Sequence, residues 1–310
     1  MKKQLTLSRD LVMVYGGQDD GVIGIPALTA DGQVIETSYF FGRKHPKNII
    51  AISSQAGCPM GCAFCELGAA RFARNLTAEE MRDQTELALI EAARYGFDRE
   101  ATPHKINVAN SGEPLLNPAL IDGLALIGGL PQTIKVSTVF PEAKQAWSNF
   151  ERLAAYAAGL KDQTVQIQVS LISTSEEERA AMSGGKTAGF AKIRQAAEWW
   201  RSKLPHGRKI NLSLMLTNDM ACDVRQLANL FPPQLFRLRF REYVPSTNGE
   251  GRGLQIVSPA RLAMIMDEAR TLGYEAGDWA SPTPTERKFG LAANAIREQY
   301  LNLLAGAKNG

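Results

Sequence analysis

Short apolar runs rich in β-branched residues alternate with longer stretches of helical periodicity along most of the chain. The apolar runs predict six strands, at residues 48–53, 105–109, 133–138, 165–171, 210–216 and 235–243. The other stretches predict helices at about residues 77–95, 142–158, 187–203, 222–230 and 258–272, the first opened by a capping box at Thr77 and Glu80. This repeated alternation predicts an α/β fold with parallel strands, arranged as a partial (β/α)6-type barrel.

The two ends of the chain follow a different pattern. Before residue 48, the turn signal Asp31-Gly32 precedes an alternating run through Val34, Glu36 and Ser38, which predicts a short N-terminal β extension. Near the C-terminus, a helix at about residues 285–304 follows a proline-broken segment. We therefore divide the chain into a β extension at 1–47, a barrel at 48–275 and a C-terminal segment with a helix at 276–310.

Three of the four cysteines, Cys58, Cys62 and Cys65, lie together in a Cx3Cx2C run just after the first predicted barrel strand. Three clustered thiolates without a nearby fourth suit a [4Fe-4S] cluster that keeps one iron open. This spacing, with Phe64 before the third cysteine, resembles the radical S-adenosylmethionine (SAM) superfamily. The resemblance implies that SAM binds the open iron near Phe64. It also implies that an external donor of flavodoxin or ferredoxin type supplies the electron that forms a 5′-deoxyadenosyl radical.

Two simpler interpretations of the cysteines fit less well. A structural zinc site needs four ligands, and the candidate fourth ligands His45 and His104 lack zinc-finger spacing. A disulfide framework would leave one of the three cysteines over, and the start of the chain has no secretory signal.

The composition limits the setting and the partners. With 45% hydrophobic residues in 310, the chain can bury a sizeable core, but no apolar run is long enough to span a membrane. We therefore predict a cytoplasmic protein without a membrane partner, in a reducing setting that suits an oxygen-sensitive cluster. A net charge of +3 permits nucleic-acid binding but does not favour it.

Several segments resemble the RlmN/Cfr family of 23S ribosomal RNA adenine methyltransferases, in the same order along the chain, from about Ile35 to about Ala295. They are Ile35–Thr37, Ser53–Cys58, Phe72–Thr77, Ser111–Asn117, Val136–Thr138 and Val169–Leu171. The resemblance implies that Gly112, Glu113, Ser137 and Ser170 contact SAM and that Glu36 is a catalytic base.

Physical arguments support these assignments. A carboxylate such as Glu113, at the carboxyl end of a strand, can accept a charge-assisted hydrogen bond from the SAM ammonium group. Gly112 lets the backbone approach a ligand, because it has no Cβ. The alternatives are an exposed turn carboxylate for Glu113, strand-end hydroxyls bonded to backbone for Ser137 and Ser170, and a solvated strand carboxylate for Glu36.

The chain departs from the family at the positions that carry methyl-transfer chemistry. Ala51 and Asn294 stand where the family has two further cysteines, and Cys222, which we interpret as a packed residue, matches neither position. We therefore predict that methyl transfer by a thiol relay does not occur. The roughly 50 residues before the cysteines also predict that the family's N-terminal accessory domain is lacking.

Three arginines alternate with apolar residues in the last predicted strand. If helices cover the apolar face, Arg237, Arg239 and Arg241 line the barrel interior and can bind a carboxylate or phosphate. The alternative is an edge strand with a solvated arginine face.

These features lead to three functional hypotheses. The first is a radical SAM enzyme that abstracts hydrogen from a substrate other than ribosomal RNA, either a small anionic molecule or a modified peptide or nucleotide. The second is a nucleic-acid-modifying methyltransferase that uses a different methyl carrier. The third is a non-catalytic iron–sulfur protein for electron transfer or sensing, which the Gly-Glu-Pro segment and the strand serines do not favour because such a protein needs no SAM site.

Overall fold

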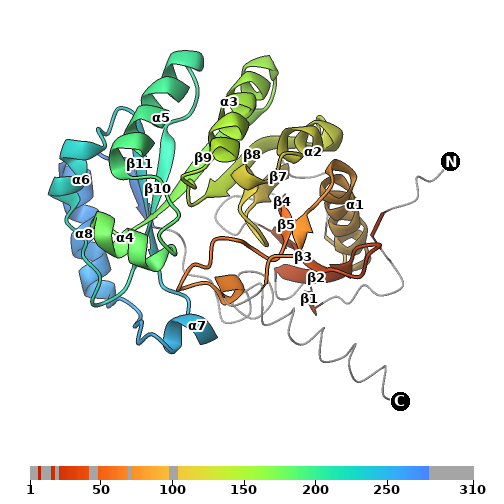
Figure 1. The fold of residues 1–310 in the computed structure, drawn as a ribbon, viewed down its shortest axis with the longest axis horizontal. Coiled ribbons are helices and arrows are strands. Elements are labelled where there is room, and N and C mark those ends of the chain that lie inside the picture. Colours follow the sequence, from red (N-terminus) through yellow and green to blue (C-terminus); the bar gives the residue numbers. More distant parts are fainter. Residues whose placement is uncertain are drawn as a thin grey trace. The chain divides into compact units, whose positions relative to one another are not determined.

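The computed structural model describes residues 6–7, 15–17, 21–41, 48–68, 71–97 and 104–278. The chain divides into two compact units (Figure 1). The first contains residues up to Pro59 and from Ala70 to Ile134. The second contains Met60–Ala69 and Lys135–Ser281. Strand β8 (Pro131–Thr138) carries the chain from the first unit into the second.

The first unit contains a sheet of mixed direction. Its strands are β1 (Tyr15–Gly17), β2 (Val22–Leu28), β3 (Val34–Phe41), β4 (Asn48–Ile52) and β7 (His104–Val108), in that order. Neighbouring strands from β1 to β4 are antiparallel, whereas β4 and β7 are parallel. The sheet thus changes from a hairpin arrangement to parallel pairing at the first predicted barrel strand.

Helix α1 (Ala78–Arg94) packs against β3 and β4 in the first unit. The predicted capping box is present, because the Thr77 hydroxyl and the Glu80 carboxylate each accept a backbone N–H of the other residue. Helix α2 (Leu120–Ile127) packs on α1 and was not predicted. An ideal Cβ on Gly123 of α2 would lie 3.0 Å from the Met81 sulfur, so a glycine here allows the two helices to pack closely.

The second unit has four parallel strands in sequence order: β9 (Thr164–Ile172), β10 (Ile210–Leu216), β11 (Phe236–Glu242) and β12 (Ala276–Asp278). One face of the sheet is apolar, with Val169, Leu212 and Leu238 almost fully buried. The alternate positions carry polar side chains, as expected for strands with a polar barrel interior.

Helices follow the strands in the second unit and pack on one another in turn (green to blue in Figure 1). Helix α3 (Lys144–Gly159) packs on α5 (Phe190–Lys203), α5 on α6 (Val224–Leu230), and α6 on α8 (Pro259–Thr271). The buried ring of Phe150 on α3 contacts Trp199 and Trp200 on α5. The short helices α4 (Glu176–Met182), α7 (Thr247–Glu250) and η1 (Glu66–Gly68) lie in the same unit.

The structure confirms the predicted α/β fold with a mostly parallel sheet. All six predicted strands and all five predicted helices up to residue 272 are present, within about three residues at each end. Among the described residues, the elements that were not predicted are α2, α4, α7, β12, the two-residue strands β5 (Gln55–Ala56) and β6 (Arg74–Asn75), and the short helices η1 and η2 (Pro114–Leu116). The predicted helix at 285–304 lies outside the described residues, and the predicted domain boundaries stay a prediction.

Within the described part of the chain, no helix is both long enough and apolar enough to cross a membrane.

Candidate functional site

The cysteine run forms a loop of tight turns. The N–H of Cys65 donates to the Cys62 carbonyl at 3.2 Å, and the N–H of Gly68 donates to the Cys65 carbonyl at 2.8 Å. Cys62 is buried, whereas Cys58 and Cys65 are partly exposed, and none of them is in a disulfide. An ideal Cβ on Gly68 would lie 2.1 Å from the Cys62 carbonyl oxygen, so only glycine allows this close approach.

Two side chains beyond the end of β11 hold this loop from within the second unit. The Asn248 amide donates to the carbonyl oxygens of Cys62 and Cys65, both at 3.2 Å. The Ser246 hydroxyl donates to the Phe64 carbonyl at 2.9 Å. The sequence interpretation missed both residues, although their place just after the last predicted strand was a signal, since barrel sites form at the carboxyl ends of strands.

Arg179 on α4 is a third support for the loop, and it too was missed. Its side chain is 1% exposed and donates to Thr187 Oγ1 and to the carbonyl oxygens of Ala188 and Val139, at 2.6–2.7 Å. The end of α4 touches the loop, because the N–H of Ala63 donates to the last carbonyl of the helix at 2.9 Å. Burial lowers the pKa of Arg179 to about 10, and attraction to Glu176 and, to a smaller extent, to Cys62 partly offsets this. The guanidinium is thus a buried positive charge near the loop at neutral pH.

These features are compatible with an iron–sulfur cluster. Among the residues described, no three His, Cys, Asp or Glu side chains are placed to hold one ion. A cluster needs thiolates that reach separate irons, and that Cys58, Cys62 and Cys65 supply them stays a prediction. A buried positive charge and fixed backbone turns are suitable surroundings for such a thiolate set.

A network of hydrogen bonds fixes the chain between β4 and Cys58 in the first unit. The Gln84 side chain on α1 accepts from the Ser53 N–H at 2.8 Å and donates to the Ser53 carbonyl at 3.0 Å. The Ser53 hydroxyl donates to the Glu36 carbonyl at 2.6 Å and accepts from the Ser111 N–H at 3.1 Å. Three segments that the sequence singled out separately therefore meet at Ser53.

Glu113 lies in this network and is 3% exposed, so it is not the exposed turn carboxylate of the alternative interpretation. Its N–H donates to Gln55 Oε1 at 2.7 Å, and its Oε1 accepts from the Leu115 N–H at 3.1 Å, at the start of the short helix η2 (Pro114–Leu116). A carboxylate has about four acceptor positions, and this cap uses one of them. Its contact with SAM stays a prediction.

The structure explains why residue 112 is a glycine, for a reason that was not visible in the sequence. Its φ of +105° is unfavourable for other residues, and an ideal Cβ would lie 2.6 Å from Gln55 Cβ and 2.7 Å from Ser54 Oγ. The glycine therefore permits close packing against residues 54–55. Whether it also contacts SAM stays a prediction.

Glu36 lies on β3 and is buried, with 4% exposure, so the interpretation as a solvated strand carboxylate is wrong. Two donors fix its backbone carbonyl: the Ser53 hydroxyl, and the Asn110 amide at 3.2 Å. The same Asn110 amide donates to the Ala51 carbonyl at 3.1 Å. Glu36 and Ala51 are therefore held diagonally adjacent on neighbouring strands, and the catalytic role of Glu36 stays a prediction.

The two strand serines lie late in their strands, as predicted. Ser137 is the second-last residue of β8, and its buried hydroxyl makes no hydrogen bond within the described structure. Ser170 is partly exposed on β9 and is paired in register with Ser213 on β10. Phe64 is partly exposed next to Cys65. Contact of these three residues with SAM stays a prediction.

The three arginines do not lie on an edge strand, because β11 pairs with β10 on one side and β12 on the other. Arg237 forms ion pairs with Glu275, which also binds Lys209. The Arg239 guanidinium lies over Gly277, where an ideal Cβ would be 2.0 Å from Nη1. Burial lowers the pKa of Arg241. The edge-strand alternative is thus wrong, whereas substrate binding by the arginines stays a prediction.

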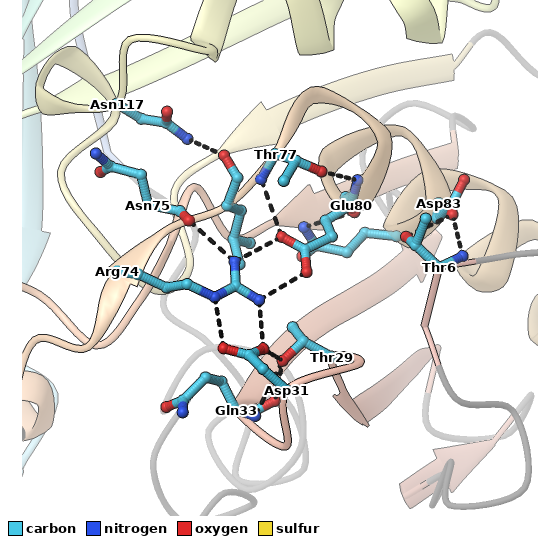
Figure 2. Close-up of polar contacts among 12 residues, drawn as sticks. Thr6, Thr29, Asp31, Gln33, Arg74, Asn75, Thr77, Glu80, Asp83 and Asn117 are labelled. Carbon is cyan, nitrogen blue, oxygen red and sulfur yellow. Dashed lines mark hydrogen bonds and ion pairs between the residues drawn. The ribbon is translucent and has the colours of Figure 1, made fainter.

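Arg74, in the segment Phe72–Thr77, is the centre of an ion-pair cluster in the first unit (Figure 2). Arg74 Nε and Nη2 donate to Asp31 at 2.8 and 2.5 Å, and Nη1 and Nη2 donate to Glu80 at 2.8 Å each. The cluster joins the β2–β3 turn to the first turn of α1. Asn117 nearby donates to the carbonyls of Ser54 and Leu76 at 2.7 and 2.9 Å, which ties the end of the Gly-Glu-Pro segment to the same region.

Cys222 lies apart from the cysteine run in sequence, just before α6. Burial raises the pKa of its thiol to about 12, so it is a neutral thiol at physiological pH. This agrees with its interpretation as a packed residue.

The chain is similar to several proteins named as probable RlmN RNA methyltransferases. The chain is 30% identical over 301 residues to the probable dual-specificity RNA methyltransferase RlmN 3 of Opitutus terrae, covering 85% of this chain and 75% of that protein. It is 30% identical over 268 residues to the probable dual-specificity RNA methyltransferase RlmN of Rhodopirellula baltica, covering 83% and 67%. For a second Opitutus terrae protein, RlmN 1, the identity is 29%, and the chain spans 62% of that protein's length. No protein-family model matches the chain.

A solved structure agrees with the fold. The crystal structure of a radical SAM methyltransferase from Sphaerobacter thermophilus matches with a TM-score of 0.70 and 22% identity, covering 89% of this chain and 77% of that one. At this identity the likeness concerns the fold, and it confirms the predicted partial barrel.

Proposed function

Because this chain belongs to the RlmN family, we propose that it is a radical SAM enzyme with a [4Fe-4S] cluster on Cys58, Cys62 and Cys65. The observation that carries the proposal is the cysteine loop, in which Asn248, Ser246 and the end of α4 fix the backbone from Cys62 to Cys65. When bound, the cluster and SAM supply a 5′-deoxyadenosyl radical. An external electron donor of flavodoxin or ferredoxin type and a cytoplasmic setting belong to the same proposal.

The chain's own residues bind and orient SAM. Glu113 offers a carboxylate, fixed by its cap to Leu115, to the SAM ammonium group. The hydroxyls of Ser137 and Ser170 and the Phe64 backbone are further contacts, and the buried Ser137 hydroxyl has a free hydrogen-bonding position for one. Each contact restricts the orientation of bound SAM. This lowers the entropic part of the activation barrier of the reaction.

We further propose that Glu36 is the base that takes a proton from the substrate after hydrogen abstraction. Its carboxylate oxygens are buried, and its backbone is fixed by Ser53 and Asn110. A base held in this way adds about 10²–10⁴-fold to a rate. The neighbouring position is Ala51, whose methyl group cannot carry a methyl group as a thiol can, so the reaction differs from a thiol relay.

There are two candidates for the substrate: RNA and a small anionic molecule. The relatives are named as RNA methyltransferases, and this name favours RNA as the substrate class. The half-buried arginines Arg239 and Arg241 favour an anionic group, either a phosphate of RNA or a small anionic molecule. RNA agrees with both observations, so it is the first candidate substrate. One reaction that it would undergo is methylation through a different methyl carrier.

The test is anaerobic reconstitution with iron and sulfide, followed by SAM and dithionite. We expect 5′-deoxyadenosine and methionine from the wild-type protein and from Cys222→Ala, and neither product from Cys62→Ala. Deuterium transfer from labelled RNA or labelled small anions into 5′-deoxyadenosine then identifies the substrate class. Normal iron content and SAM cleavage in Cys62→Ala would overturn the proposal.

A further inference from the structure

A row of small and polar residues crosses the first unit's sheet at the position of Ala51. The strand register pairs Gly24 with Ser38, Ser38 with Ala51, and Ala51 with Asn107. Paired residues point to the same face of a sheet, and Glu36 shares this face because it lies two residues from Ser38. Ala51 is therefore flanked by Ser38 and Asn107, with Glu36 diagonally adjacent.

The opposite face of these strands is the ordinary packed core. Tyr39, Ile50 and Ile106 have no measurable exposure, and α1 packs on β3 and β4 at this face. The Thr37 hydroxyl, also on this side, donates to the Ala51 carbonyl at 2.8 Å. The polar row is thus on the face that α1 does not cover, which is the interior face of a barrel.

Asn107 indicates that this face receives a ligand. The residue is 8% exposed, and its buried amide oxygen accepts no hydrogen bond within the described structure. A buried acceptor without a donor costs about 1–3 kcal/mol, so such groups usually have a partner that completes them. A leucine of similar size would avoid this cost in a strand that only had to pack.

The side chains around Ala51 present mainly acceptors. Glu36 brings two carboxylate oxygens and Asn107 one amide oxygen, and both residues are more than nine-tenths buried. Ser38, 5% exposed, adds a hydroxyl that either donates or accepts. The strands of Glu36 and Asn107 lie about 10 Å apart, two strand spacings, with the small side chains of Ser38 and Ala51 between them. A planar group of a few atoms spans this distance with a hydrogen bond at each side.

We propose that Glu36, Ser38 and Asn107 form a substrate subsite over Ala51 that selects a group with two N–H donors on one edge, as in a guanidinium ion or the N1/N2 edge of guanine. The subsite rests on the proposed function, because it is the place where that enzyme would hold its substrate. A carboxylate accepts two parallel N–H bonds, and a buried carboxylate favours donors over further acceptors. A group with a carbonyl on the same edge would face the oxygens of Glu36 and Asn107 and be rejected.

The experiment measures binding of two pairs of probes to the reconstituted protein by isothermal titration calorimetry. The first pair is methylguanidinium and methylurea, and the second is guanosine and inosine, which lacks the 2-amino group. We expect methylguanidinium, guanosine or both to bind at least fivefold more tightly than the matched probe. A preference in the first pair alone indicates an alkylguanidine substrate, and one in the second pair indicates a nucleobase.

Variants decide whether this subsite causes the preference. Asn107→Leu should lose about tenfold in affinity, the loss of one buried hydrogen bond of about 1.4 kcal/mol, whereas Asn107→Asp keeps the acceptor and should bind at least as well. Asn229→Leu, on the exposed face of α6, is the matched control and should bind like the wild type. Ser38→Val tests the subsite from the adjacent strand if circular dichroism shows that Asn107→Leu does not fold.

Two results would overturn the subsite: equal binding within both pairs, or a preference that Asn107→Leu and Ser38→Val leave intact. Failure of the proposed function is seen separately, as a wild-type protein that does not cleave SAM under dithionite. The probe measurements do not depend on SAM cleavage, so the two failures are distinguishable.

Discussion

Asn248 donates a 3.2 Å hydrogen bond from its side-chain amide to the carbonyl oxygen of Cys62, a residue 186 positions earlier in the chain. The same amide serves the Cys65 carbonyl at the same distance. One side chain therefore sets the spacing of two proposed cluster ligands without being a ligand itself. Residues of this kind affect a metal centre through the orientation of its ligands.

We expect Asn248→Ala to bind the cluster but to lose it faster. Removal of the amide leaves two loop carbonyls without this donor, so the loop should open more often. The rate at which a chelator removes iron, followed by the loss of visible absorbance, should rise severalfold. Asn229→Ala, an exposed asparagine on α6, is the control and should not change the rate. An unchanged rate in Asn248→Ala would mean that the turns within the loop suffice to hold it.

Glu113→Gln should weaken SAM binding by about 1–3 kcal/mol, the value of a hydrogen bond to a charged group. Glutamine retains an oxygen that can cap Leu115, so the local fold should be kept while the negative charge is lost. The dissociation constant for SAM, measured anaerobically on the loaded protein, checks this. Equal affinity in the two proteins would limit Glu113 to its structural cap.

The wild-type protein should consume SAM without forming S-adenosylhomocysteine in stoichiometric amounts. The Ala51 side chain has no sulfur that could carry a methyl group. The Cys222 thiol is neutral, because burial raises its pKa to about 12. Methionine and 5′-deoxyadenosine should be the SAM products, as quantified by liquid chromatography. Methylated adenine together with one S-adenosylhomocysteine per turnover would reveal a methyl carrier that we have not identified.

The Asp31–Arg74 pair should make part of the stability depend on pH. The hydrogen bonds from Arg74 hold the pKa of the Asp31 carboxyl well below its usual range. A lowered pKa in the folded state gives stability that is present above about pH 4, the unfolded value, and is lost as the pH falls below it. Since Asp31 is half exposed, the pair is worth about 1 kcal/mol or less.

Thermal melting of the wild type and Asp31→Asn between pH 7 and pH 3 checks this prediction. The wild type should be slightly more stable at pH 7, and the difference should shrink as the pH falls toward 3. A difference that stays constant with pH would assign the effect to packing of the turn rather than to charge.

The sequence predicted the framework of the fold because local signals and tertiary packing agree there. The strand at 210–216 has apolar residues at alternate positions, and the Thr77–Glu80 box marks the start of α1. Helix α2 was missed because Gly123 weakens its helical signal, and the reason for this glycine is a contact with Met81 from another helix. Such a contact is not visible in a local pattern.

The candidate site was predicted only in part, for a related reason. Cys58, Cys62 and Cys65 were identified because their spacing is local. Asn248 acts through the carbonyl of Cys62, 186 positions away, and Arg179 through that of Val139, 40 positions away, and any residue type can offer a carbonyl. Their function depends on the tertiary fold, so an ordinary asparagine on a short helix carried little signal by itself.

The buried Arg179 has a consequence for proteolysis of the segment after α4. Lys186 is exposed and follows two glycines with φ near +70°, so it resembles an easy site for trypsin. The Arg179 guanidinium, however, binds Thr187 and Ala188 directly after it, and the Lys186 carbonyl accepts from the Glu142 N–H at 2.8 Å. Cleavage at Lys186 therefore requires local unfolding. Resistance at this bond would report whether the support under the cysteine loop is intact, even in protein that has lost its iron.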